Sequence, residues 1–125
     1  MREIKFRAWV KKDYYGHGIA DYMEGDASCF NNPFEEHEDG NIILMQYTGL
    51  KDKHGVEIYE GDIIRSDKDS PIGTVVTAKV YWKGAGFALL TTRGSDTTSA
   101  YLELLSPFCE VIGNVHKHPH LLKGE

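Results

Sequence analysis

The stretch that most constrains the fold is residues 45–66, "MQYTGLKDKHGVEIYEGDIIRS". Two β-prone runs flank "KDKHG", whose polar residues and glycine are typical of a hairpin turn, with Gly55 supplying a positive φ. After the second run, Gly61 permits a sharp change of direction, and the Asp62 carboxylate can accept backbone N–H groups of the turn. Short β-barrels make corners in this way, so we interpret the stretch as architecture rather than as a catalytic loop or ligand cradle.

Alternating or short apolar runs predict further strands on both sides of this corner. At the amino end, "EIKFRAWV" places four apolar residues on one face and three residues on the other: Ile4, Phe6, Ala8 and Val10 against Lys5, Arg7 and Trp9. "NIILMQYTG" (41–49) predicts a buried strand. The runs at 73–82 and 86–92 predict a second hairpin through residues 83–86. "FCEVIGNVH" (108–116) predicts a last strand, in which Gly113 indicates a bulge or a close approach.

Two segments break this pattern. Residues 11–40 lose all periodicity and carry scattered glycines, "NNP" and "EEHEDG", so they predict a long irregular excursion with room for a short hairpin at 14–18. Residues 97–105, "TTSAYLELL", are compatible with a short helix or a strand, and we expect the helix. The fold class is therefore all-β, with at most one short helix.

The net charge of −5 is unevenly distributed along the chain. Residues 1–12 carry +4, whereas residues 13–40 contain eight acids and no lysine or arginine. Attraction between the two segments explains the pattern structurally, and a bipolar surface that steers a partner is the functional alternative. A net acidic domain is poorly suited to gripping phosphates, which disfavours nucleic acid as a partner.

The length and composition predict one domain spanning all 125 residues, with an N-terminal strand and acidic excursion at 1–44 and a barrel at 45–125. No apolar run is long enough to cross a membrane, and the amino end lacks the apolar core of a signal peptide. Cys29 and Cys109 form no disulfide framework and no C-x-x-C motif. We expect a cytoplasmic protein with no membrane contact.

Three blocks of the sequence carry a resemblance to a known family: "REIKFRAW", "YTGLKDKHGVEIYEGDII" and "EVIGNVHKHPHLL". Together they resemble the YopX family of phage and prophage proteins. The resemblance implies an SH3-type β-barrel from about residue 45 onward, with an N-terminal strand packed alongside. It also implies a bacterial or phage source, in a family with no established biochemical activity.

The side chains that could support chemistry each have a simpler structural explanation. His116, His118 and His120 alternate and could hold zinc or nickel, but Pro119 and the nearby chain end favour a solvated tail, so we expect no metal site and no cofactor. A cysteine within a strand is more often a small core residue than a nucleophile. Turn geometry explains the acids around the corner: Glu57, Glu60 and Asp62.

The remaining candidates are aromatic side chains on or beside predicted strands, namely Tyr47, Tyr59, Tyr81, Trp82 and Phe87. Such rings bind peptides or nucleic acid on small barrels. Because strand neighbours face opposite sides, one of Tyr81 and Trp82 is expected at the surface, where it binds a ligand, covers the barrel's open end or forms a subunit contact.

We therefore predict a non-enzymatic protein–protein interaction module that binds an unidentified host or phage protein, or a second copy of itself. The first alternative is a barrel that binds single-stranded nucleic acid through the basic N-terminal strand and the aromatics. The second alternative is a small hydrolase built on carboxylates.

Overall fold

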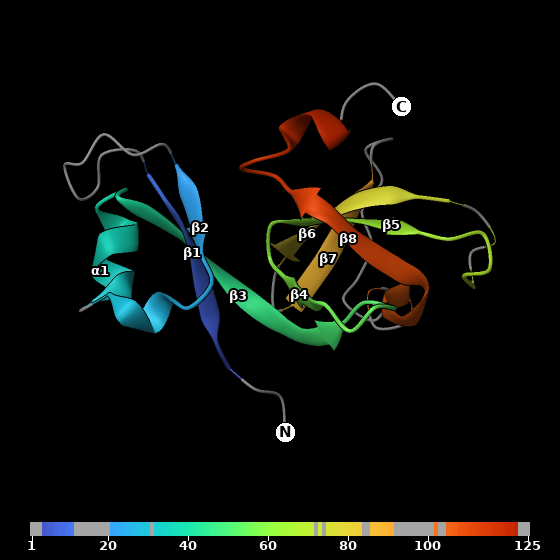
Figure 1. Ribbon diagram of the computed structural model, residues 1–125, viewed down its shortest axis with the longest axis horizontal. Helices are drawn as coiled ribbons and strands as arrows, with labels where there is room; N and C mark the ends of the chain where they lie inside the picture. Colours follow the sequence, from blue (N-terminus) through green and yellow to red (C-terminus); the bar gives the residue numbers. More distant parts are fainter. Residues whose placement is uncertain are drawn as a thin grey trace. The chain divides into compact units, whose positions relative to one another are not determined.

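The computed structural model describes residues 4–11, 21–30, 32–71, 73, 75–83, 86–91, 102 and 105–122. Within these residues the protein is predominantly β, with two four-stranded sheets of order β2-β1-β3-β4 and β7-β6-β5-β8. The predicted β class is thus confirmed as a mostly β fold with two antiparallel sheets. The chain divides into two compact units, unit 1 at residues 1–47 and unit 2 at residues 48–125. Figure 1 shows the elements of both. No helix in the described part of the chain is long and apolar enough to span a membrane.

Unit 1 is built around strand β1 (Phe6–Val10), which pairs antiparallel with β2 (Tyr22–Glu24) and with the first half of β3 (Ile42–Lys51). One face of these strands is apolar because side chains two positions apart point the same way. Its core joins strand residues to the segment after β2: Ala8, Val10, Ala27, Phe30 and Ile42, with Phe6, Tyr22 and Leu44 packed against them.

The prediction for β1 needs two corrections. Ile4, expected on the apolar face, lies before the strand begins and is 74% exposed. Trp9, expected beside Lys5 and Arg7 on the polar face, is buried. Both faces of the sheet are therefore covered near Trp9, which a one-sided alternation does not anticipate.

The prediction of an irregular excursion over residues 11–40 is wrong for much of the segment. Besides β2, it contains a 3-10 turn, η1 (Ala27–Cys29), and a helix, α1 (Pro33–Glu38). Asn32 starts α1: its side-chain oxygen accepts from the Glu35 N–H at 3.2 Å, and its Nδ2 donates to the Glu35 carboxylate at 3.0 Å. Proline at the first helical position fits the start of a helix. The predicted hairpin at 14–18 lies outside the described residues.

In unit 2, the corner predicted from residues 45–66 is confirmed. β3 and β4 (Glu57–Tyr59) are neighbours joined by a turn in which Gly55 has φ +82°, and Gly61 has φ +89° where β4 leads into β5 (Asp62–Ser66). The Asp62 carboxylate accepts a hydrogen bond from the Tyr59 N–H at 2.8 Å. Its oxygen thereby satisfies a backbone donor inside the corner, as the sequence predicted.

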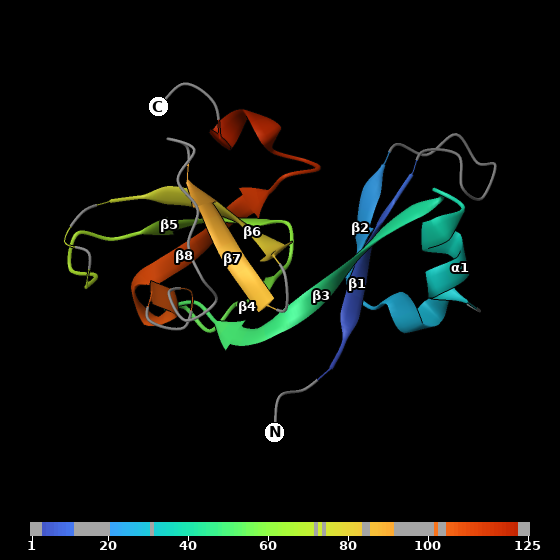
Figure 2. The ribbon, with the colours of Figure 1, turned by 180° about the vertical axis from the view of Figure 1, so that it is seen from behind.

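The second predicted hairpin is also present. β6 (Thr77–Lys83) and β7 (Gly86–Thr91) pair antiparallel up to the partners Lys83 and Gly86. Figure 2 brings this hairpin to the front. Its inner face joins the core of unit 2, a cluster of Ile58, Ile64, Ala78, Val80, Phe87, Leu89, Leu102, Leu105 and Cys109. The helix expected at 97–105 lies outside the described residues, apart from the buried Leu102 and Leu105.

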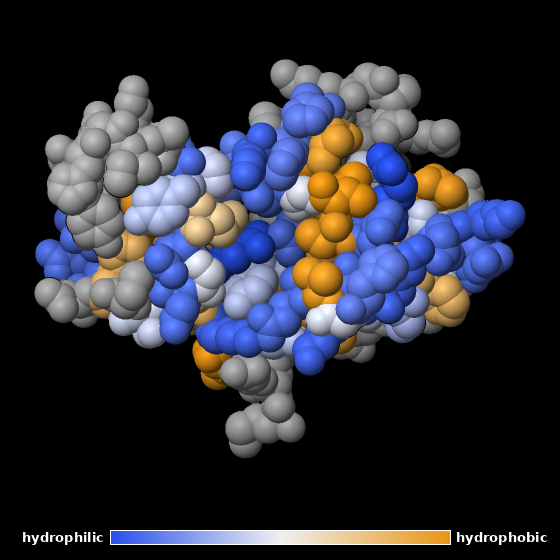
Figure 3. Space-filling view, in the orientation of Figure 1, coloured by the Kyte–Doolittle hydropathy of each residue, from blue (hydrophilic) through white to orange (hydrophobic). Residues whose placement is uncertain are grey.

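The last strand, β8 (Cys109–Asn114), pairs with β5, and both expectations for Gly113 hold. The register shifts where Ile63 faces Gly113 and Ile64 faces Val111, which leaves one extra residue in β8. A Cβ added at Gly113 would lie 2.7 Å from His118 Nδ1 and 2.9 Å from the Leu121 side chain. The 3-10 turn η3 (Pro119–Leu122) follows, and a band of hydrophobic residues runs over it and the end of β8 (Figure 3).

Candidate functional site

The five predicted contact aromatics do not form one exposed face. Tyr47 belongs to unit 1 and the other four to unit 2. Three of the rings are buried, those of Tyr47, Tyr59 and Phe87. Tyr81 is half-buried, and Trp82 is 46% exposed. The expectation that one member of the adjacent pair reaches the surface is met by Trp82, and the role of all five as partner contacts stays a prediction.

Trp82 lies at the end of the β6–β7 hairpin, directly opposite Phe87. The two rings pack edge to face, with centroids 4.8 Å apart and planes at 86°. Directly opposed residues share one face of a sheet, so Trp82 lies on the same side as the core residues Phe87 and Val80. Its indole therefore continues the core outward to solvent, and its exposed part is held in place by Phe87.

Tyr81 points to the other face of β6, together with Lys79. The Lys79 ammonium lies 5.9 Å from the centroid of the Tyr81 ring, within the range of a cation–π contact. Tyr81 is half-buried there rather than part of the core. The adjacent pair thus presents an indole on one side of the hairpin and a phenol beside a cation on the other.

Two side chains considered for chemistry have structural roles. Cys109 is buried, and burial, followed by the nearby Asp52 charge, raises the pKa of its thiol to about 12. The thiol stays protonated at neutral pH and donates to the Ser106 carbonyl at 3.5 Å, which does not suit a nucleophile. Asp62 is buried and bonded to the corner. The side chain of Cys29 lies outside the described part.

The Asp52 carboxylate accepts three backbone hydrogen bonds in unit 2. One carboxylate oxygen accepts from the N–H groups of His54 and Val56, at 2.8 and 2.9 Å, and the other accepts from Val111 N–H at 2.9 Å. Burial alone would raise the pKa of Asp52, but these three bonds outweigh it and lower the pKa. The side chain thus joins the β3–β4 turn to β8 as a structural latch.

The histidines near the carboxyl end also have structural contacts. His118 Nδ1 accepts from the Asn114 N–H at 3.3 Å, and the rings of His118 and His120 lie 6.1 Å apart. Among the residues that the structure describes, no three His, Cys, Asp or Glu side chains gather closely enough to hold a metal. The expectation that this tail holds no metal stays a prediction.

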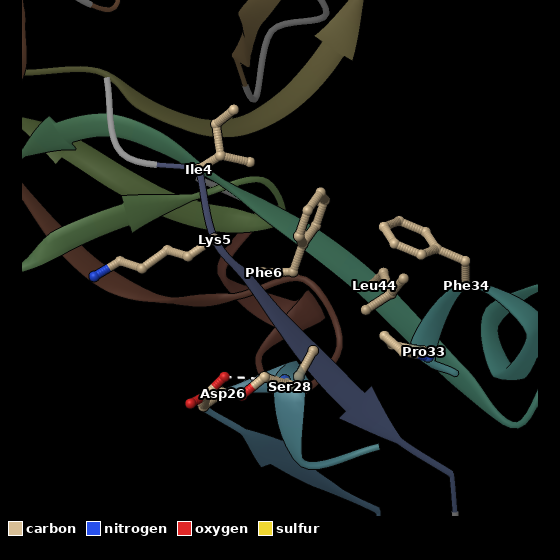
Figure 4. A pocket seen from close by; sticks show the side chains of 9 residues that line it. Ile4, Lys5, Phe6, Asp26, Ser28, Pro33, Phe34 and Leu44 are labelled. Carbon is tan, nitrogen blue, oxygen red and sulfur yellow. Dashed lines mark hydrogen bonds between the residues drawn. The ribbon is translucent and has the colours of Figure 1, made fainter. Parts of the chain in front are cut away.

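A surface that the sequence did not predict lies in unit 1, where an apolar groove of about 250 Å³ opens beside β1 (Figure 4). Phe6 of β1 and Phe34 of α1 line it and pack against each other edge to face, with centroids 5.5 Å apart. Leu44 of β3 and Pro33 lie below the rings, and Ile4 lies at the upper end. Phe34 is 57% exposed, although it is a large apolar side chain on a short helix.

The polar edge of the groove is acidic. Asp26 and Ser28 line it, and the Asp26 carboxylate accepts from the Ser28 N–H at 2.9 Å. Hydrogen bonds from the Ser28 side chain and backbone lower the pKa of Asp26, so its charge is present at neutral pH. Lys5 also lines the groove, but its ammonium lies 4.8 Å from the Tyr47 ring centroid and points away from Phe6 (Figure 4).

One local signal could have revealed part of this groove. Asn32 followed three residues later by Glu35, with Pro33 between them, is a helix-start signature. A helix starting there exposes Phe34, the single large apolar residue of "NNPFEEHEDG". The pairing of β1 with β3, which brings Phe6 and Leu44 beside that helix, is a long-range feature that no local pattern reveals.

The fold and these surfaces define a small, predominantly β protein with exposed hydrophobic side chains in both units. A scan of family models matches residues 5–123 to the YopX protein family, so the chain belongs to the YopX family. Among solved structures it is similar to "protein EF1440 from Enterococcus faecalis", with a TM-score of 0.55 and 23% sequence identity over 98% of this chain and 100% of that one. This likeness supports the fold alone. None of the curated proteins compared with the chain matches it.

Proposed function

We propose that this protein is a non-enzymatic protein–protein interaction module of phage or prophage type, acting in the cytoplasm of a bacterial host. Unit 2 is proposed to be a small SH3-like barrel that presents Trp82 to a host or phage protein. The observation that carries the proposal is a tryptophan 46% exposed yet fixed by an edge-to-face contact with the buried Phe87.

A tryptophan held in this way suits an interface. Large aromatic side chains dominate binding energies, and one that is already ordered loses little side-chain entropy when a partner covers it. The buried, protonated Cys109 and the structurally engaged Asp62 do not offer the activated groups of an enzyme. A second copy of the chain is the other partner that this surface would suit.

The test compares Trp82→Ser with Val75→Ser. Val75 is also an exposed apolar residue of unit 2, at 56%, so it is a matched control. Affinity capture from infected or induced host cells, with proteins and nucleic acids both identified, should recover a partner that is lost with Trp82→Ser and kept with Val75→Ser. Equal capture by both variants, with folding confirmed by circular dichroism, contradicts the role of Trp82. A change of sedimentation in Trp82→Ser alone identifies self-association.

Binding of single-stranded nucleic acid is the second candidate, because the hairpin offers two rings for base stacking, Trp82 on one face and Tyr81 beside the Lys79 cation on the other. Stacked bases and a nearby cation are the means by which small barrels hold single strands. Trp9 is buried, so a change in tryptophan emission on adding oligo-dT reports on Trp82. Emission that changes with oligo-dT and recovers at high salt favours this candidate, and unchanged emission excludes stacking on Trp82.

A further inference from the structure

The groove of unit 1 differs in composition from the Trp82 surface. Its lining includes Phe6 and Leu44, two partly buried side chains that pack against the unit 1 core. Ile4, which precedes β1 and is 74% exposed, also lines the groove, and the helix adds Phe34 at 57%. Two of the five most exposed large hydrophobic side chains of the described residues thus line one hollow, which is typical of an interaction site.

The size of the groove limits what it can hold. Its volume of about 250 Å³ falls below the ~300–1,000 Å³ of pockets that enclose small-molecule ligands. The edge-to-face pair of Phe6 and Phe34 leaves ring surface for an aliphatic or aromatic side chain, with Leu44 and Pro33 beneath it. A hollow of this kind suits one or two anchoring side chains of a peptide.

The charge around the groove indicates which residues should flank the anchoring side chain of a bound peptide. Residues 13–40, which supply α1 and the Asp26 edge, contain eight acids and no lysine or arginine. Asp26 is exposed at the groove itself, and Glu35 and Glu36 occupy the first turn of α1 beside Phe34. Lys5, the cation among the lining residues, points its ammonium toward Tyr47. An apolar anchor flanked by acids is complementary to an apolar residue flanked by lysine or arginine.

We propose that the groove between β1, η1 and α1 binds a short basic segment of a partner protein that packs one aliphatic or aromatic side chain against the Phe6–Phe34 pair. This site belongs to unit 1 and Trp82 to unit 2, and the proposal does not rest on the function proposed for Trp82. Apolar contact supplies the affinity of the complex, and the acidic edge selects basic partners and accelerates their association.

The experiment uses the full chain and a displayed library of random peptides about twelve residues long, a length that covers the groove and its charged edge. Selected peptides are synthesised and their affinities measured by fluorescence anisotropy. We expect the enriched peptides to share a Leu, Ile, Met or Phe next to Lys or Arg. Phe34→Ser should weaken their binding about tenfold or more, as expected for loss of an aromatic anchor.

Two further variants separate the apolar and electrostatic contributions. The double variant Asp26→Asn, Glu35→Gln removes two charges. It keeps side-chain oxygens that can accept hydrogen bonds from the Ser28 N–H and from Asn32 Nδ2. It should weaken binding, and it should flatten the dependence on salt between about 0.05 and about 0.5 M. Trp82→Ser is the matched control, an exposed aromatic of the other unit, and should bind the same peptides with unchanged affinity.

Several outcomes overturn the proposal. Enriched peptides that lack basic residues, or affinities unchanged by Phe34→Ser in a chain that circular dichroism shows to be folded, exclude this occupant. A library that yields no groove-dependent peptide does the same. Concentration-dependent dimers that dissociate in Phe34→Ser would replace the partner segment with a second copy of this chain. Loss of binding in Trp82→Ser alone would assign the peptides to the other surface and leave the groove without this role.

Discussion

The contacts that fix the turns and connecting segments differ between the two units. In unit 2, turns are fixed by buried carboxylates: Asp52 accepts from three backbone N–H groups, and Asp62 accepts from the Tyr59 N–H at the corner that contains Gly61. In unit 1, the segment that follows β2 buries Ala27 and Phe30 in the core, and its hydrogen bonds are exposed, such as the cap of α1 by Asn32. Unit 2 thus adds polar contacts of buried carboxylates to its apolar core, whereas unit 1 combines apolar packing with exposed hydrogen bonds and an open groove.

This difference predicts where mutations will be costly. A buried donor that loses its acceptor has no water to replace it, whereas an exposed group does. Hydrogen exchange measured amide by amide can follow each unit separately, because protection reports local and global opening free energies. We therefore expect the largest losses from the polar groups of unit 2 and the smallest from the exposed side chains of unit 1.

Among the polar contacts, the largest effect is expected for Asp52→Ala. It removes the acceptor of the N–H groups of His54, Val56 and Val111, which are partly buried, and should reduce the free energy of unfolding by about 2 to 4 kcal/mol. Asp52→Asn is the matched control: it keeps the oxygen that serves the turn but loses the bond to Val111, so its loss should be smaller. Urea unfolding measures both variants. Equal losses would show that the bond to β8, and not the turn, accounts for the effect.

The same carboxylate predicts a dependence on pH. Its folded-state pKa is lowered below the ordinary value of 3.8, so its contribution to stability is fully present above that value. The contribution should be lost as the pH falls through the lowered folded-state pKa. Urea midpoints measured from pH 6 to about pH 2 should fall less steeply in Asp52→Asn than in the wild-type chain. If the midpoints of the wild-type chain and of Asp52→Asn fell in parallel with pH, the Asp52 carboxylate would not contribute the stability proposed for it.

Gly61→Val comes next, with an expected loss of about 1 to 3 kcal/mol because a β-branched residue is strained at positive φ. Gly61 has φ +89° and is buried, so its packed surroundings limit any backbone shift that would relieve the strain. Urea melts of both forms measure the loss. Gly55→Val isolates the cost of positive φ, since Gly55 has φ +82° and no atom within 4 Å of an added Cβ; a similar loss there would assign the effect of Gly61→Val to its φ rather than to crowding. Equal midpoints for wild type and Gly61→Val would show that Gly61 does not need its glycine conformation.

The contrast between units also explains what the sequence could predict. The corner in unit 2 was predictable because Gly55, Gly61 and Asp62 act on backbone within a few residues of themselves. The strands β1 and β3 were predictable from their apolar patterns. The burial of Trp9 was not, because it depends on covering both faces of a sheet through contacts remote in sequence.

The candidate sites were predicted less well than the fold. Among the five aromatics, sequence could say that Tyr81 and Trp82 face opposite ways, but the distance from each to the core depends on where the hairpin ends. Phe34 was overlooked because the many acids around it suggested a solvated loop. The cap made by Asn32 and Glu35 shows that a polar segment can still specify a helix through its first few residues.

In unit 1, Asn32→Ala should cost about 1 kcal/mol, the usual loss for removing a helix cap. It removes the acceptor for the Glu35 N–H and the donor to the Glu35 carboxylate. Hydrogen exchange should show reduced protection over α1 with unit 2 amides unchanged. Asn32→Asp, which retains an acceptor oxygen, should recover most of the protection. A loss spread evenly over both units would contradict the view that they open separately.

The smallest effect is expected for Phe34→Ser, below about 0.5 kcal/mol, since an exposed side chain away from core contacts contributes little to folding. In the wild-type chain the Phe34 ring contacts Phe6, but it is 57% exposed and α1 contains no buried residue, so little burial is lost with the ring. Phe87→Ala, which removes a buried ring from unit 2, is the reference and should cost about 3 to 5 kcal/mol. If urea melts show Phe34→Ser losing as much as Asn32→Ala, the ring belongs to the core of unit 1 and the groove is a packing defect. A near-zero loss would show that folding does not need the Phe34 ring. The ring is then available to bind a partner, as the proposed groove requires.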